Sequence, residues 1–162
     1  MTSPFVATAN PPAKGAEAPV RNDGFYPDVD CEQLRKDLRL DGTATPDRLV
    51  LAIEAAMWAV NAELADWQAE QVAAGYSTLA AIPAMQLGAE SVKTKQYRRA
   101  INASVQSQLA EGYRDMDTLP SGAGKESRVL SALEIRVDTF NTQLRHAIAD
   151  LLGKPRVIAE LL

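Results

Sequence analysis

The sequence has very few of the side chains that bind metals or act as nucleophiles, with a single cysteine, Cys31, and a single histidine, His146. One cysteine excludes an intramolecular disulfide, which suits a reducing cytoplasm. A zinc site or a nucleophilic site needs several partner residues, and the sequence offers none for either side chain. We therefore expect no catalytic residue, no metal site, no cofactor and no enzymatic activity.

Aromatic residues are also scarce, at 6% of the chain, whereas alanine and leucine are plentiful. This composition favours helices over sheets. No apolar run approaches the roughly 18 residues that a membrane span needs. The first residues lack a basic end followed by an apolar run, so we expect no secretory signal. The 162 residues suffice for one soluble domain with its own core.

Charge is unevenly distributed along the chain, although the formal net charge is only −4, which argues against a general nucleic-acid binder. Residues 46–74 hold five acidic residues and one basic residue, whereas residues 90–116 hold five basic and three acidic ones. These charges either pair within the chain, or an acidic flank of one subunit meets a basic flank of the next. Such head-to-tail contacts close into rings when the rotation permits. The candidate contact residues are Glu63, Asp66, Glu70, Lys95, Arg98 and Arg99.

Two segments partly resemble motifs for catalysis or phosphate binding. Glu63, Asp66 and Glu70 recur at three- and four-residue steps, but carboxylates at this spacing usually form a solvated helix face. Residues 121–125 combine two glycines with Lys125. They lack the full phosphate-loop spacing, and no strand is expected before them, so we assign no phosphate site.

Residues 45–75 form the segment around which the predicted fold is built. Thr45 can cap a helix, Pro46 suits its first position, and Gly75 suits the position just past its end. The segment predicts one unbroken helix roughly 43 Å long, which we expect to be the spine of a bundle. Its apolar stripe consists of Leu49, Ile53, Met57, Val60, Leu64 and Trp67.

The remaining periodicity predicts one short helix, a single helical turn and two further long helices. The short helix covers residues 31–38 and is capped by Asp30, and the turn at residues 78–82 ends at Pro83. The long helices cover residues 90–116 and 125–152. We expect an all-α fold, an antiparallel helical bundle with three long helices plus one short N-terminal helix. The predicted buried faces are Tyr97, Ile101, Val105, Leu109 and Tyr113 in one helix, and Leu133, Val137, Phe140, Leu144, Ala147 and Leu151 in the other.

The composition divides the chain into three parts, residues 1–24, 25–155 and 156–162. The first is rich in proline and small residues and predicts a flexible N-terminal arm. The second is the helical bundle, and its first residues, Phe25, Tyr26 and Pro27, are expected to latch onto it. The third is an extended C-terminal tail that either folds back on the bundle or adds to the edge of a neighbour's sheet. Its candidate contact residues are Arg156, Val157, Ile158, Leu161 and Leu162.

Several short segments, in their order and spacing, carry a resemblance to a known family. They are Phe25-Tyr26-Pro27-Asp28, Leu40-Asp41-Gly42-Thr43, Asn61-Ala62-Glu63-Leu64-Ala65-Asp66-Trp67, Ala74-Gly75-Tyr76, Thr78-Leu79-Ala80, Tyr97-Arg98-Arg99-Ala100 and Tyr113-Arg114. Together they resemble the head completion (head stabilisation) proteins, the gene product L family, of temperate contractile-tailed phages. The resemblance covers residues 25–162 and departs in the proline-rich start and the loop at residues 119–125.

This resemblance implies a helical adaptor in the virion neck that is assembled in the host cytoplasm. Such proteins form a ring, expected to be twelvefold, under the portal after DNA packaging, where they seal the genome and offer an attachment surface to the tail. The implied partners are the portal protein, further copies of the chain, and a tail-side neck or tail terminator protein. DNA is expected to pass through the ring without specific binding, and no membrane is involved. We expect the tail residues to bind portal, and Glu63, Asp66 and Glu70 or residues 41–47 to line the channel.

The alternative function is that of a small helical DNA-binding or packaging-regulatory protein that uses Arg98, Arg99 and Arg114. The sequence shows no helix-turn-helix signature, because the helix predicted for residues 46–74 is too long and too acidic. The basic residues are also sparse. A salt-dependent gel shift with duplex DNA distinguishes the two functions, since an adaptor should bind little DNA.

Overall fold

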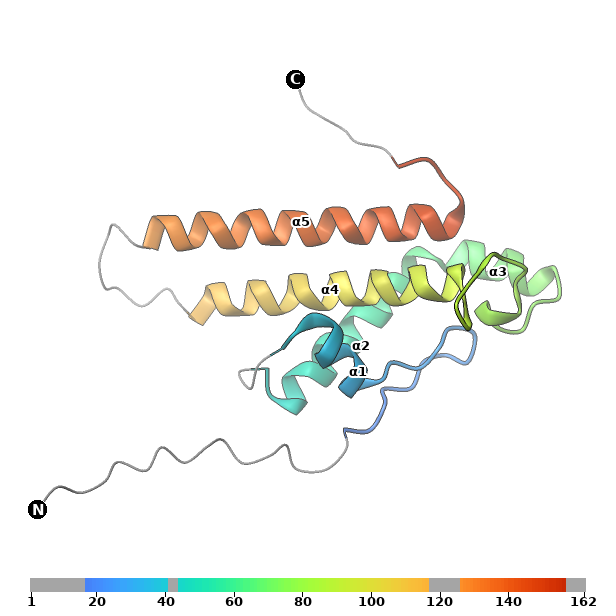
Figure 1. Ribbon diagram of the computed structural model, residues 1–162, viewed down its shortest axis with the longest axis horizontal. Coiled ribbons are helices and arrows are strands. Elements are labelled where there is room, and N and C mark those ends of the chain that lie inside the picture. The colour runs from blue at the N-terminus through green and yellow to red at the C-terminus, as the bar shows by residue number, and fades with distance from the viewer. Residues whose placement is uncertain (1–16, 41–43, 117–125, 157–162) are drawn as a thin grey trace, which may run out of the picture.

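The structure, a computed structural model, describes the backbone of residues 17–40, 44–116 and 126–156, and the side chains of these segments outside residues 113–135. The described chain is mostly helical, which confirms the predicted class at that level. Figure 1 shows the course of the chain. The elements are α1 (Cys31–Leu38), α2 (Pro46–Glu63), α3 (Ala65–Ala73), the 3₁₀ turn η1 (Leu79–Ala81), β1 (Gln86–Leu87), β2 (Glu90–Ser91), α4 (Val92–Met116) and α5 (Glu126–Leu152).

Helix α4 is the central element, with α5 along one side and α1 and α2 against the other (Figure 1). α5 runs in the opposite direction to α4, and Ser107 in α4 donates to Asn141 in α5 at 3.0 Å. The side chains of Tyr97, Ile101 and Val105 in α4 are buried, as predicted. In α5, Ala147 and Leu151 are buried, whereas Val137, Phe140 and Leu144 are half-buried; Leu109 in α4 is also half-buried. The side chains of Tyr113 and Leu133 lie outside the described residues.

The helix ends follow the local sequence rules. Asp30 accepts from the Gln33 amide and caps α1, which covers the predicted residues. Thr45 accepts from the Arg48 amide at 3.4 Å, and Pro46 is the first residue of α2. Gly153, which follows α5, has a φ of 68°, a conformation that glycine adopts without a Cβ clash. Local capping chemistry therefore determines where these helices begin and end.

The prediction of one unbroken helix over residues 46–74 was wrong, because the structure divides this segment into α2 and α3 at Leu64. Leu64 has φ −93° and ψ 0°, yet its amide still donates to Val60 and its carbonyl accepts from Gln68, so the break is a local bend. No proline or glycine causes it. The fully buried Leu64 lies between Asn61 and Trp67, which both contact the N-terminal segment. We attribute the bend to these tertiary contacts.

The connector before α4 contains a two-stranded antiparallel hairpin that the sequence reasoning missed. Gln86 pairs with Ser91 and Leu87 with Glu90, around a turn in which Gly88 has a φ of 67°. The predicted helical turn is present as η1. Because Glu90 and Ser91 belong to the strand, α4 begins at Val92, whose amide donates to the Met85 carbonyl at 2.9 Å.

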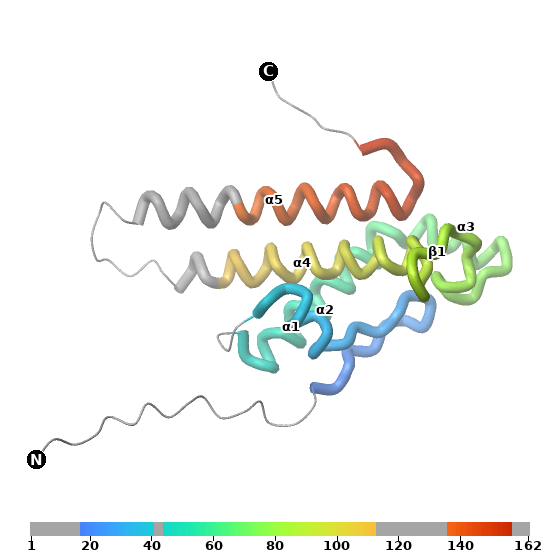
Figure 2. The backbone as a smooth tube through the Cα atoms, in the orientation of Figure 1, coloured from blue at the N-terminus to red at the C-terminus, as the bar shows by residue number. Residues whose placement is uncertain are grey.

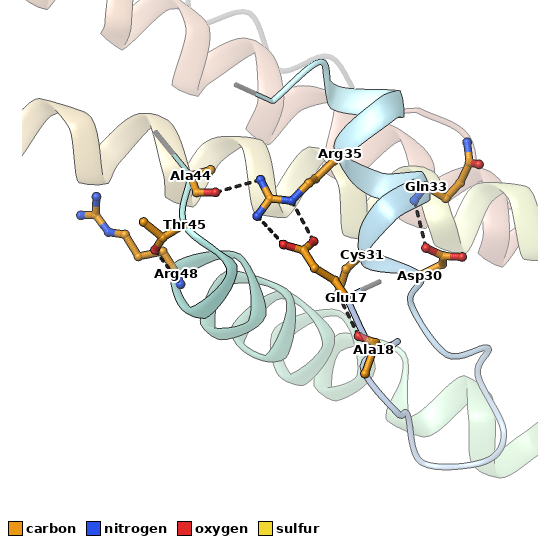
Figure 3. Close-up of polar contacts among 9 residues, drawn as sticks. All are labelled: Glu17, Ala18, Asp30, Cys31, Gln33, Arg35, Ala44, Thr45 and Arg48. Atoms are coloured by element: carbon orange, nitrogen blue, oxygen red, sulfur yellow. Dashed lines mark hydrogen bonds and ion pairs between the residues drawn. The ribbon is translucent and has the colours of Figure 1, made fainter. Parts of the chain in front are cut away.

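Residues 17–24, which the sequence assigns to the N-terminal arm, contact the helices. Glu17 forms an ion pair with Arg35 in α1 at 2.8 Å, and Arg35 also donates to the Ala44 carbonyl ahead of α2 (Figure 3). Val20 and Val29 form an isolated antiparallel bridge. Arg35 thus joins the N-terminal segment, α1 and the start of α2. Residues 1–16 of the predicted arm, the predicted turn at residues 41–43, and residues 157–162 of the tail lie outside the described residues.

Candidate interaction surfaces

The aromatic pair Phe25 and Tyr26 packs into the core between α3 and α4. Both amides donate to the Asp23 side chain at 3.0 Å, and the Phe25 carbonyl accepts from the Leu79 amide at 2.9 Å. The Tyr26 ring stacks on Tyr97 in α4, with centroids 4.5 Å apart and planes 7° apart. Phe25 meets Trp67 of α3 edge to face at 6.5 Å. Phe25 and Tyr26 are thus buried and Pro27 half-buried, so these residues attach the N-terminal segment to the helices.

A closed ring of three hydrogen bonds fixes the same segment to α2 and α4. The Tyr97 hydroxyl donates to Asn61 at 2.7 Å, Asn61 donates to Asn22 at 2.8 Å, and Asn22 donates back to the Tyr97 oxygen at 2.8 Å. Burial raises the pKa of Tyr97 above its ordinary value, and likewise that of Tyr26. Tyr97 therefore serves a structural network, and nothing in this geometry activates it for proton transfer.

Several elements meet where α4 begins and α5 ends, at the end of the molecule that also holds α3 (Figure 2). Lys93 in α4 lies 5.1 Å from the centroid of the Trp67 ring and donates to the Leu151 carbonyl at 2.8 Å. Burial lowers the pKa of Lys93. One cation therefore ties α3, α4 and α5 together, and it also satisfies one of the free carbonyls at the end of α5.

The charged residues predicted for contacts between subunits are all exposed, and they lie on separate elements. Glu63 ends α2, while Asp66 and Glu70 lie on α3. A shallow surface depression of about 260 Å³ lies along α4. It is lined by Glu90, Lys95, Arg98, Arg99, Asn102, Ala103, Gln106 and Gln143. Arg98 forms an ion pair with Glu90 at 2.6 Å, and exposed pairs of this kind are worth little. The acidic and basic residues of the prediction make no ion pair with one another among the described residues.

The described part of the C-terminal tail turns back onto α5. Arg156 forms an ion pair with Asp150 at 2.6 Å, and the hydrogen bond from Arg156 lowers the pKa of Asp150. The other predicted portal-binding residues, Val157, Ile158, Leu161 and Leu162, lie outside the described residues, as does the glycine-rich segment at residues 121–125. Arg114 of the DNA-binding alternative has its backbone in α4, but its side chain is not among those described.

Cys31 and His146 lie in different surroundings. The Cys31 thiol is buried and donates to the Ala18 carbonyl at 3.3 Å, and burial raises its pKa, so it is a structural thiol. His146 is half-buried in α5. The described residues contain no group of acidic residues, cysteine and histidine arranged to hold a metal ion. No helix in the described part of the chain is long and apolar enough to cross a membrane.

The sequence reasoning missed an exposed apolar face on α2. Trp58 is 78% exposed and Leu51 is 65% exposed, and the alanines Ala55, Ala59 and Ala62 beside them are exposed as well. The signal was present in the sequence, because these residues form a second apolar stripe opposite the buried one. Large apolar side chains outside this face are also exposed at Val72, Met85 and Leu87.

Comparison with known proteins identifies the family. The model of the phage head completion protein (GPL) family matches residues 20–162. The chain belongs to this family. A curated member, the head completion/stabilization protein of Escherichia phage P2, is 36% identical over 148 residues, which cover 91% of this chain and 85% of that protein. No solved structure matches the chain at a significant level.

The head completion match begins at Val20, the residue that forms the isolated bridge with Val29. It therefore includes the aromatic pair, the hydrogen-bonded ring and all the helices. The resemblance inferred from the short sequence segments is thus confirmed. Both the family and the phage P2 relative are named for completing or stabilising a head and not for a catalysed reaction.

Proposed function

We propose that this chain is a structural virion protein, an adaptor without catalytic activity that forms a ring, expected to be twelvefold, under the portal. The ring assembles after DNA packaging, seals the packaged genome and offers the surface to which the tail side attaches. The observation that carries the proposal is the match to the head completion family over residues 20–162. The described surface carries exposed apolar side chains and a depression lined by charged residues, which are suited to protein contacts.

The test uses phage particles assembled with and without this chain. Heads made without it should package DNA, then lose it and remain without tails, and supplying the chain from a plasmid should restore both properties. Electron microscopy counts filled and tailed particles, and nuclease treatment measures the protected DNA. Heads that keep their DNA and accept tails in the absence of the chain would contradict the proposed function.

The C-terminal tail is the proposed portal contact. α5 ends at Leu152, where Gly153 and Lys154 donate to carbonyls of its last turn, so the helix is complete before the tail begins. Removing residues 156–162 should leave a folded protein whose binding to purified portal is lost. Circular dichroism checks the fold and sedimentation with portal measures the binding. Arg156→Ala is the matched control, because it removes the ion pair with Asp150 and keeps the apolar tail residues.

A truncated chain that binds portal with unchanged affinity would show that the contact lies elsewhere. If Arg156→Ala alone abolishes binding, the charged residue and not the apolar tail carries the contact.

The channel wall is proposed to be acidic or neutral, since DNA slides best where contacts are weak. A wall lined by Arg98 and Arg99 in a map of the neck would contradict this.

A further inference from the structure

Helix α2 is apolar on the side that faces solvent as well as on the side that faces the core. Val60 and Ala56 are buried, and Trp58, two residues from each, is turned by about 200° to the opposite side. Between Ala55 and Ala62 no exposed residue carries a charge. We call the exposed residues Ala55, Trp58, Ala59 and Ala62 the α2 outer face. Leu51 is exposed as well, but it lines a depression with Gln108 and Leu109 of α4 and is not part of this face.

A helix that is apolar all round is normally covered on all sides. No element of the described chain covers the α2 outer face, so a partner molecule is the remaining means of covering it. Its charged neighbours point to the kind of partner. Glu54 lies one turn before Trp58, and Glu63 follows Ala62, so the rim around Trp58 is acidic. The exposed basic residue on this side of α2 is Arg48, which lies about two turns before Ala55 and outside this rim. Self-pairing of two such faces would bring the acidic rims together, which disfavours a symmetric contact and favours a basic partner surface.

The chain has a basic surface on the far side of α4. The Tyr97 side chain points toward α2, since its hydroxyl donates to Asn61. Lys95 and Arg99 each lie two residues from Tyr97, so helical geometry turns both away from α2. They line the depression of about 260 Å³ that also contains Arg98. We call Lys95, Arg98, Arg99, Asn102 and Gln106 the α4 basic face. The α2 outer face and the α4 basic face thus lie on opposite sides of the layer that α2 and α4 form.

We propose that the α2 outer face of one copy docks on the α4 basic face of the next copy. Trp58 enters the depression, where the guanidinium groups of Arg98 and Arg99 can stack on the indole ring. The acidic rim meets the lysine and arginine side chains around it. Because the two faces differ and lie on opposite sides of the subunit, the contact is head-to-tail and repeats around a ring. This inference rests on the proposed ring and names Trp58 as the centre of the contact between its subunits.

The test cross-links neighbouring subunits through introduced cysteines. Particles are assembled with equal amounts of Ala62→Cys and Asn102→Cys chains of different mass, treated with a short bismaleimide, and the mixed product is measured. Ala62 is exposed one turn after Trp58, and Asn102 lines the depression, so Trp58, Arg98 and Arg99 themselves are kept. The same pair is treated as purified full-length protein at high concentration. The native Cys31 is buried and does not compete. Met85→Cys replaces Ala62→Cys in the matched control, because Met85 is 70% exposed and belongs to neither face.

The mixed Ala62→Cys and Asn102→Cys product should exceed the control product by about tenfold or more in at least one of the two samples. Equal yields in both samples would overturn the inference, as would a predominance of product between two Ala62→Cys chains. The particle experiment on DNA retention distinguishes a failure of this subunit contact from a failure of the proposed function. If heads need the chain to keep their DNA but the mixed cross-linked product does not exceed the control product, this contact is contradicted and the proposed function stands. Heads that keep their DNA without the chain contradict the proposed function itself.

Discussion

Replacing Tyr97 with alanine should lower the free energy of unfolding by about 4 kcal/mol. Tyr97 is the largest of the fully buried side chains, at 1% exposure, and it takes part in both the Tyr26 stack and the hydrogen-bonded ring. The substitution leaves a cavity and deprives the Asn22 and Asn61 amides of a partner. Urea denaturation followed by circular dichroism measures the change. A loss below about 2 kcal/mol would show that the network does not hold the N-terminal segment in place.

Two phenylalanine variants separate the hydroxyl groups from the rings. Tyr97→Phe keeps the stack but breaks the ring of hydrogen bonds, so it should lower the free energy of unfolding by about 1–3 kcal/mol. Tyr26→Phe is the matched control, because the buried Tyr26 hydroxyl has no hydrogen-bond partner within the described residues. Its stability should be unchanged, or higher by about 1 kcal/mol, since an unsatisfied polar group is removed. Equal losses in the two variants would contradict the assigned hydrogen bonds.

The free energy of unfolding should fall by about 2 kcal/mol between pH values of about 10 and about 11, because of the two stacked tyrosines. Burial raises the pKa of Tyr26 and of Tyr97, so both phenols stay protonated in the folded protein. In the unfolded chain they ionise at about pH 10. The unfolded state then holds fewer protons, and stability decreases as the pH rises. Below about pH 10 both states keep the phenols protonated, and the full contribution is present.

Denaturant unfolding over this pH range tests the expectation by comparing variants. Tyr26→Phe removes one of the two phenols and should halve the part of the slope that they contribute. Tyr26→Phe combined with Tyr97→Phe should remove that part. If the double variant keeps the slope of the unsubstituted protein, the two buried phenols do not cause the alkaline loss of stability.

The features that local sequence predicted well are those that local chemistry controls. Asp30 and Thr45 cap helices through hydrogen bonds to amides three residues away, and Gly153 ends α5 through its own backbone conformation. The buried stripe of α4 follows from four-residue spacing alone. The charged residues that were predicted to form contacts between subunits are exposed, as is expected of residues on a solvated helix face. None of these features depends on residues far away in the chain.

The errors concern contacts between distant parts of the sequence. The break at Leu64 has no proline or glycine to announce it, and it accompanies contacts with Asn22 and Phe25 roughly forty residues earlier. The hairpin before α4 is too short for strand periodicity to reveal. The contacts of residues 17–24 with the helices were not predicted, because the Glu17–Arg35 pair cannot be inferred from composition.

The sequence by itself determined the helical class, the capped starts of α1 and α2, the end of α5 and the head completion family, since periodicity, capping and short segments are all local properties. Tertiary structure alone decided that the first long helix bends, that Tyr97 closes a hydrogen-bonded ring, and that Trp58 stays exposed. The physical reason is that an apolar stripe in the sequence shows only that burial of that side of the helix is favourable. Which stripe faces the chain's own core, and which is left for a partner, depends on how the helices pack.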